Sequence, residues 1–172
     1  MAQFVDFARH SAKQKDLNYY GQHFLLHPKN LRAQKLPVNL KWDRVRFSKA
    51  NLSKIALDPG IYAFVIGSDD PNLPVHGYVL YIGQTGAKAN DRTLRERATE
   101  YYQEKSRPKR MAVFEFLNKW QRCLFFHFAP VDPALADLLT IESTLNDSLM
   151  PPYSERDFSP EVRTRKKIWE KT

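Results

Sequence analysis

Five side chains in this sequence of 172 residues have the right types to act on a phosphate ester. Tyr62 and Tyr81 stand in two separate apolar runs, while Arg97 and Tyr101 are spaced i, i+4 and so share one face of a helix. Glu142 falls inside the apolar stripe of a later helix, where a carboxylate is costly unless a cation or a metal compensates for it. Together these groups predict phosphoryl chemistry, which depends mainly on positioning and charge stabilisation. Each has a plainer alternative, since paired tyrosines pack in sheets and a lone glutamate can form a salt bridge.

The two apolar runs contain one triplet written forwards and then backwards, GIY at 60–62 and YIG at 81–83. Both runs, GIYAFVI and GYVLYIGQ, are rich in β-branched and aromatic residues and predict strands. We expect them to pair as an antiparallel hairpin in which the triplets are opposed, so that Gly60 faces Gly83 and the two tyrosines face each other on one side of the sheet. The terminal glycines would let a ligand or another backbone come close.

The elements that follow must position these side chains. The stretch TLRERATEYYQEK predicts a helix that begins with a capping box of Thr93 and Glu96. The stretches MAVFEFLNKWQ and RCLFFHFAPV predict a second helix and a third strand, and Asp132 followed by Pro133 predicts the start of a long helix that ends at the proline pair 151–152. The expected fold class is therefore α/β, with a small, mainly antiparallel three-stranded sheet flanked by helices.

The charge of the chain is concentrated at its N-terminal end. The net charge is +8, and residues 1–57 hold eleven lysines and arginines against three aspartates, whereas the remainder is balanced. Aromatic residues are interspersed among these cations, and the combination of positive charge with rings for stacking suits a nucleic acid. The alternative is a basic surface that keeps the protein soluble. We expect a basic N-terminal extension at 1–57, a central domain at 58–155 and a basic tail at 156–172 that is either a second DNA contact or disordered.

The chain resembles the GIY-YIG nuclease family over roughly residues 58–155. The two triplets match the naming motif of the family to the letter, and TLRERATEYY is similar to the helix that carries its arginine and its tyrosine or histidine. The segment IESTLNDSLMPPYSE is similar to the later motif, in which a glutamate precedes a Pro-aromatic-Asn ending. Two features depart from the family: the spacer between the triplets is longer than in compact members, and Ser154 stands where asparagine is usual.

The resemblance implies hydrolysis of a DNA phosphodiester with one divalent metal ion, Mg²⁺ or Mn²⁺. Glu142 would hold the metal, and Arg97 would stabilise the charge of the transition state. Tyr62 would orient or deprotonate the attacking water, while Tyr81 and Tyr101 would hold the phosphate and the water in line. These five residues are the expected catalytic set.

The expected DNA contacts are basic side chains on either side of the strand pair: Lys41, Arg44, Arg46, Lys88 and Arg95. A chain that stands alone with a basic arm favours a restriction or mobile-element endonuclease. A DNA-repair nuclease and a binding module that does not cut are the alternatives, and the sequence leaves open whether a homodimer cuts both strands. No apolar run is long enough to span a bilayer and no signal peptide is evident, so we expect a cytoplasmic protein without a membrane partner.

Overall fold

The protein is built around one four-stranded antiparallel sheet in the order β1-β4-β2-β3. The structure is a computed structural model that describes residues 21–33, 35–87, 91–106, 109–154 and 157–169. The strands are β1 (Asp43–Arg46), β2 (Gly60–Gly67), β3 (Gly77–Thr85) and β4 (Leu124–Pro130). The helices are α2 (Pro28–Ala33), α3 (Leu94–Glu104), α4 (Met111–Lys119), α5 (Leu138–Leu149) and α6 (Pro160–Trp169), with a 3₁₀ helix η1 at Lys49–Lys54. None of the described helices combines the length and the apolar character needed to cross a membrane.

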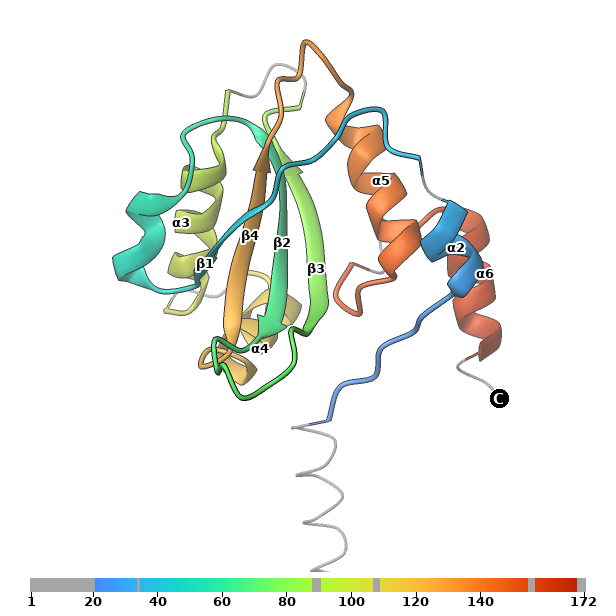
Figure 1. The fold of residues 1–172 in the computed structure, drawn as a ribbon, viewed down its shortest axis with the longest axis horizontal. Helices are drawn as coiled ribbons and strands as arrows, with labels where there is room; N and C mark the ends of the chain where they lie inside the picture. Colours follow the sequence, from blue (N-terminus) through green and yellow to red (C-terminus); the bar gives the residue numbers. More distant parts are fainter. Residues whose placement is uncertain (1–20, 34, 88–90, 107–108, 155–156, 170–172) are drawn as a thin grey trace, which may run out of the picture.

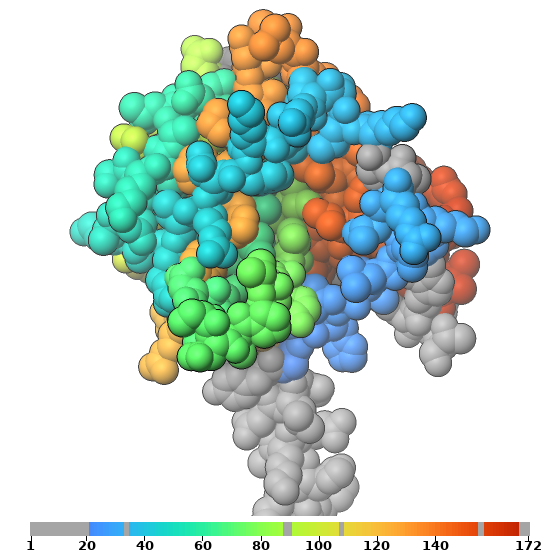
Figure 2. All heavy atoms as spheres, viewed as in Figure 1, coloured from blue at the N-terminus to red at the C-terminus, as the bar shows by residue number. Residues whose placement is uncertain are grey.

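Each face of the sheet has its own hydrophobic core. On one face, side chains of β2 and β4 such as Tyr62, Phe64 and Phe126 pack against α3, α4 and η1. On the other face, Ile61 and Ala63 pack against α5 and against residues 36–40. The segment that leads into β1 crosses this second face in front of the strands, and α5 lies beside the β3 edge (Figure 1). The atoms of the segment that leads into β1 form a continuous band over the sheet (Figure 2). Successive residues of a strand point to opposite faces, so alternate residues of β2 belong to the two hydrophobic cores.

The expectation of a three-stranded sheet is wrong, because β1 adds a fourth strand to the outer side of β4. Its sequence, DRVR, has a single apolar residue, Val45, and therefore does not read as a strand. An edge strand rich in charge is common in natural sheets because it discourages pairing with another chain. Residues 43–57, which the sequence assigned to the N-terminal extension, contribute this strand and the buried side chains of Phe47 and Ile55 to the same core.

The hairpin of β2 and β3 forms as expected, but its register differs by two residues. Tyr62 lies opposite Gly83, and Phe64 rather than Tyr62 lies opposite Tyr81. A Cβ atom on Gly83 would lie 2.4 Å from the Tyr62 hydroxyl oxygen, so the phenol occupies the space that a side chain at this position would fill. Because the slip is an even number of residues, both tyrosines keep the face that the sequence predicted.

Gly60 likewise allows a close approach, but to a different neighbour than expected. It faces Thr85 on β3 rather than Gly83, and on its other side it pairs with Pro130 of β4. A Cβ atom at Gly60 would lie 2.2 Å from the carbonyl oxygen of Ala129. The backbone of β4 therefore occupies the space above this glycine.

The long helix α5 begins five residues later than the sequence predicted. Asp137 is its N-cap, accepting a hydrogen bond from the backbone N–H of Leu139 at 3.1 Å. Asp132 instead organises a turn, in which its carboxylate accepts from the backbone N–H of Ala134 at 2.9 Å. The predicted end is confirmed, since the helix stops at Leu149 before the proline pair. The residues of the tail at 160–169 form α6, and its Val162 is buried against Met150.

Candidate active site

The centre of the candidate site is Tyr62, whose side chain is buried on the face of β2 that meets α3. Its ring stacks on Phe126 of the neighbouring strand, with centroids 5.4 Å apart, and meets Tyr101 edge to face at 5.7 Å. The hydroxyl groups of Tyr62 and Tyr101 are 3.0 Å apart, within hydrogen-bond distance. Burial, followed by the nearby Tyr101 and Tyr81, raises the pKa of Tyr62 well above its usual value. The Tyr62 hydroxyl is therefore a neutral phenol at physiological pH.

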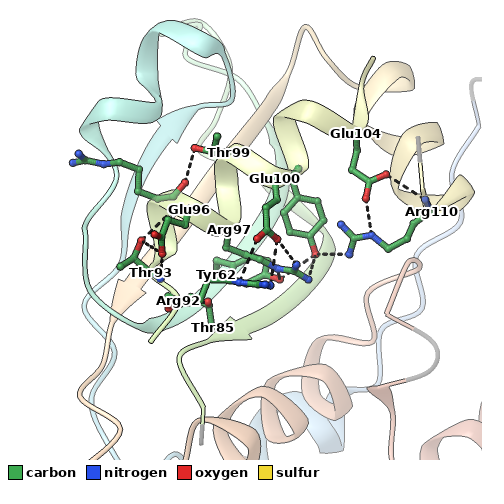
Figure 3. A network of polar contacts seen from close by, with 12 residues as sticks. Tyr62, Thr85, Arg92, Thr93, Glu96, Arg97, Thr99, Glu100, Glu104 and Arg110 are labelled. Carbon is green, nitrogen blue, oxygen red and sulfur yellow. Dashed lines mark hydrogen bonds and ion pairs between the residues drawn. The ribbon is translucent and has the colours of Figure 1, made fainter. Parts of the chain in front are cut away.

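Arg97 joins the two tyrosines. Its Nε donates to the Tyr62 hydroxyl at 3.1 Å (Figure 3). Its Nη2 donates to the Tyr101 hydroxyl at 3.4 Å. The guanidinium carbon also lies 4.8 Å from the centroid of the Tyr101 ring. The predicted i, i+4 relation of Arg97 and Tyr101 is thus confirmed, and their shared face points at β2.

Helix α3 holds this arrangement through a well-defined start. The predicted capping box is present: the Thr93 side chain accepts from the Glu96 backbone N–H, and the Glu96 carboxylate accepts from the Thr93 backbone N–H at 2.8 Å. The N–H groups of Leu94 and Arg95 reach the carbonyl oxygens of Asp58 and Ala56, just before β2. These bonds tie the first turn of α3 to the strand that carries Tyr62.

Tyr81 lies at the edge of the same group. Its ring stacks on Phe116 of α4 with centroids 6.3 Å apart, and the Tyr101 ring is 6.1 Å away. Burial and the proximity of Tyr101 raise the pKa of Tyr81, so this hydroxyl is also neutral at physiological pH. Tyr81 borders a cavity of about 690 Å³ together with Arg110 and Asp157.

Glu142 on α5 is half-buried and belongs electrostatically to the same site. Burial raises the pKa of its carboxyl to about 7, and the negative charge of Asp157 adds to this effect. A hydrogen bond from the Gln84 backbone and the positive charge of Arg97 partly oppose it. The residue therefore sits near the end of β3 with too little positive charge around it to balance a buried carboxylate.

The surroundings of Glu142 fit a hard divalent cation. Mg²⁺ binds through one or two carboxylates, keeps several water ligands and uses oxygens of a substrate phosphate, so it needs no cage made only of protein. The described part of the chain contains no group of three or more His, Cys, Asp or Glu residues that could hold a metal. Because a nearby positive charge stabilises a half-buried carboxylate, Glu142 is the residue of the expected set that could hold such an ion.

Ser154 occupies the position where the resemblance leads one to expect asparagine, and it is 1% exposed. Its hydroxyl oxygen accepts a hydrogen bond from the Ile82 backbone N–H at 3.1 Å and donates to the Ile82 carbonyl at 3.4 Å. The neighbouring N–H of Tyr153 donates to the Leu80 carbonyl at 3.0 Å. The segment after α5 therefore satisfies the outer edge of β3, and Ser154 keeps the end of α5 attached to the strand of Tyr81.

The structure does not bring the expected DNA contacts of the arm to this site. Arg44 and Arg46 lie over the Phe125 ring at 5.2 and 5.5 Å and both pair with Asp69. Phe125 alternates with Phe126 along β4, so the two arginines are on the opposite face of the sheet from Tyr62.

The other three expected contacts differ in position. Lys41 is exposed just before β1, and Lys88 lies outside the described residues. Arg95 is on the first turn of α3, where its Nε donates to the Ile55 carbonyl at 2.8 Å, and it borders a cavity of about 610 Å³. Contact of these residues with DNA stays a prediction.

Three charged residues of the site were missed by sequence reasoning. Glu100 accepts from Arg97 Nη1 at 2.8 Å (Figure 3). Arg110 places its guanidinium carbon 4.6 Å from the Tyr101 centroid. Glu104 accepts from Arg110 Nε at 3.0 Å and is 6% exposed. The argument that singled out Glu142 applies to Glu104 as well, because a residue three positions after Tyr101 lies on the buried stripe of the same helix.

No known protein family, curated protein or solved structure was found to match the chain. The function must therefore be argued from the site alone.

Proposed function

We propose that this protein is a metal-dependent DNA endonuclease of the GIY-YIG type, of the restriction or mobile-element class. The observation that carries the proposal is the arrangement around Arg97: one guanidinium donates to Tyr62 of β2 and to Tyr101 of α3, and its charge acts on Glu142 of α5. Elements β2 and α3 thus place a positive charge in direct contact with two phenols, and a carboxylate of α5 lies within electrostatic reach. Phosphoryl transfer depends mainly on such positioning and charge stabilisation.

Each residue has a role that its surroundings support. Arg97 is 20% exposed and permanently charged, so its remaining N–H groups can stabilise negative charge on a phosphate. Tyr62 is a neutral phenol, which favours orienting the attacking water over removing its proton. Glu142 would hold Mg²⁺ or Mn²⁺, and a bound divalent ion supplies a Lewis acid that offsets charge on the phosphate oxygens. Tyr81 borders a cavity and would help to align the phosphate and the water, whereas the buried Tyr101 would act by holding Arg97.

The test is cleavage of plasmid and genomic DNA by the purified protein with Mg²⁺ or with EDTA. Discrete fragments with Mg²⁺ would support sequence-specific cutting, whereas intact DNA with both Mg²⁺ and Mn²⁺ would refute the enzyme and leave a binding module. Tyr62→Phe should lower cutting by roughly 10²-fold, the scale for losing one well-placed electrostatic or hydrogen-bonding group. Tyr78→Phe is the matched control, because Tyr78 is a half-exposed tyrosine on β3 whose ring contacts Phe24.

The basic arm offers a separate test of the DNA partner. If Lys41, Arg44 and Arg46 grip phosphates, neutralising all three should flatten the dependence of log affinity on log salt concentration by about three units of slope, one for each lost contact. An unchanged slope would show that DNA is held on the face of Arg97 instead. Cleavage of both strands by a homodimer stays a prediction, which the sedimentation of the protein bound to its cut site would decide.

A further inference from the structure

Arg97 also borders a cavity of about 570 Å³ between α3 and the start of α4, and further cations line the same cavity. Its charged lining comprises four cations and two carboxylates, namely Arg92, Arg97, Lys109, Arg110, Glu100 and Glu104. The cavity therefore carries a net charge of about +2 when all six groups are ionised. Such a surplus, presented by guanidinium and ammonium groups, suits a phosphate ester.

Glu104 holds Arg110 in place. Its carboxylate accepts from the backbone N–H groups of Lys109 and Arg110 at 2.7 and 3.2 Å and from Arg110 Nε at 3.0 Å. Burial acts to raise the pKa of Glu104, but these hydrogen bonds outweigh it and leave the pKa below its usual value. A buried, ionised carboxylate costs free energy unless it is fully paired. Within the described ranges, its donors come from residues 109 and 110. The arrangement positions one arginine.

Arg110 in turn reaches the hydroxyl group that Arg97 also contacts. Its Nη1 lies 3.5 Å from the Tyr101 oxygen, and Arg97 Nη2 lies 3.4 Å from the same atom. Two positive charges converge on one phenol, and Glu100 and Glu104 each pair with one of them. Among the described residues, Nη2 of Arg110 has no hydrogen-bond partner, and the side chain is 38% exposed. The Arg110 guanidinium is therefore held in place and charged, and it has an N–H group that can donate to a ligand.

Arg110 and Arg97 are distinct positions, because the Tyr101 hydroxyl lies between their two guanidinium groups. The proposed function assigns the scissile phosphate to Arg97, which donates hydrogen bonds to both Tyr62 and Tyr101. Lys109 and Arg110 instead border both the cavity next to α3 and the cavity next to Tyr81. A nucleic-acid strand that presents one phosphate to Arg97 would therefore present a neighbouring phosphate to this pair.

We propose that Lys109 and Arg110 form a subsite for the DNA phosphate that neighbours the scissile one, with the buried Tyr101 hydroxyl between Arg110 and Arg97. The inference rests on the proposed function for the identity of the scissile phosphate. Arg110 binds through its planar N–H groups and Lys109 through its ammonium group. Glu104 is a positioning residue that sets the direction of Arg110.

The first arm of the test measures DNA binding without cutting, in EDTA, over a series of salt concentrations. Arg110→Gln and Lys109→Gln should each lower the slope of log affinity against log salt by about one, the value for one lost phosphate contact. Arg122→Gln removes a positive charge from an exposed residue of the α4–β4 turn and should leave the slope unchanged. Lys109→Gln also controls for folding, because Glu104 uses only the backbone of Lys109. Unchanged slopes in both variants would overturn the inference.

The second arm identifies the phosphate. Duplexes carry one uncharged methylphosphonate linkage at successive positions around the mapped cut. For the parent protein, a neutral linkage next to the cut should slow cleavage about tenfold. Arg110→Gln should be slowed already and lose nothing more at that linkage, while linkages elsewhere affect both proteins equally. Equal additional losses at every linkage would overturn the inference and leave the nuclease assignment standing.

A parent protein that never cuts would refute the proposed function, and the first arm would then decide alone whether Lys109 and Arg110 bind phosphate.

Discussion

Replacing Glu142 by glutamine should stabilise the protein at alkaline pH while it abolishes metal binding. The pKa of this carboxyl is raised from 4.5 to about 7 in the folded protein, so the folded state binds the proton more tightly than the unfolded state. The resulting contribution to stability is present below pH 4.5 and is lost as the pH rises through 7. A difference of about 2.5 pKa units corresponds to roughly 3 kcal/mol, an upper bound because the side chain is only half-buried.

Glu142→Gln should therefore match the parent in free energy of unfolding near pH 4.5 and exceed it by up to about 3 kcal/mol at pH 8. Urea unfolding of both proteins at pH 4.5, 6, 7 and 8, without divalent ions, measures this difference. Glu161→Gln is the control, because Glu161 is an exposed carboxylate that pairs with Arg165 on α6. Its difference from the parent should not follow the same curve.

Magnesium should narrow this difference in stability, because it should stabilise the parent alone. A ligand at ten times its dissociation constant stabilises the folded state by about 1.4 kcal/mol. At pH 8 we expect Mg²⁺ to raise the stability of the parent and to leave Glu142→Gln unchanged, since the glutamine lacks the charged ligand. Parallel stability curves for the two proteins from pH 4.5 to 8 would refute the electrostatic account of Glu142. Equal stabilisation of both by Mg²⁺ would place the metal elsewhere.

Three further predictions concern the supports of the site. Gly83→Ala should destabilise the protein by about 1–3 kcal/mol in urea unfolding and lower the cleavage rate, because the new Cβ displaces the Tyr62 hydroxyl. Cleavage at the parent rate would argue against a role of the Tyr62 hydroxyl in the reaction. Ser154→Ala should lower the free energy of unfolding by about 1–3 kcal/mol in the same assay, because the buried N–H of Ile82 loses its acceptor. An unchanged free energy of unfolding would mean that water replaces the hydroxyl. Thr93→Ala should cost about 1 kcal/mol through the lost cap, which circular dichroism of thermal unfolding can measure.

The parts of the fold that the sequence predicts well are those decided by local chemistry. The capping box at Thr93, the shared face of Arg97 and Tyr101 and the end of α5 before its proline pair all depend on residues within one or two helical turns. The start of α5 shows the limit of such reasoning. Asp132 and Asp137 are both good N-caps, and only the packing of Leu138 against the sheet selects the second.

Contacts between distant elements could not be read in the same way. The symmetry of the triplets suggested that like residues oppose each other, but the register of an antiparallel pair depends on how its side chains fill space. In this hairpin the Tyr62 phenol occupies the space over Gly83. Strand β1 is held by its backbone pairing with β4. Its sequence, DRVR, lacks the alternation of apolar and polar residues that would predict a strand.

The position of Arg110 shows why a site is harder to predict than its individual members. Nothing in the local sequence distinguishes it from the many other basic residues of this chain. Its importance comes from the buried carboxylate of Glu104, six residues earlier at the end of α3. Among the described residues, this carboxylate accepts hydrogen bonds from Lys109 and Arg110. A search for buried acids on apolar helix faces finds both Glu104 and Glu142 in this sequence. In the first case the compensating cation is Arg110, and in the second the surrounding charge is insufficient, which is the condition expected of a residue that binds a metal. The contrast between these two glutamates, one lowered and one raised in pKa, separates the residue that positions the site from the residue that we expect to act in it.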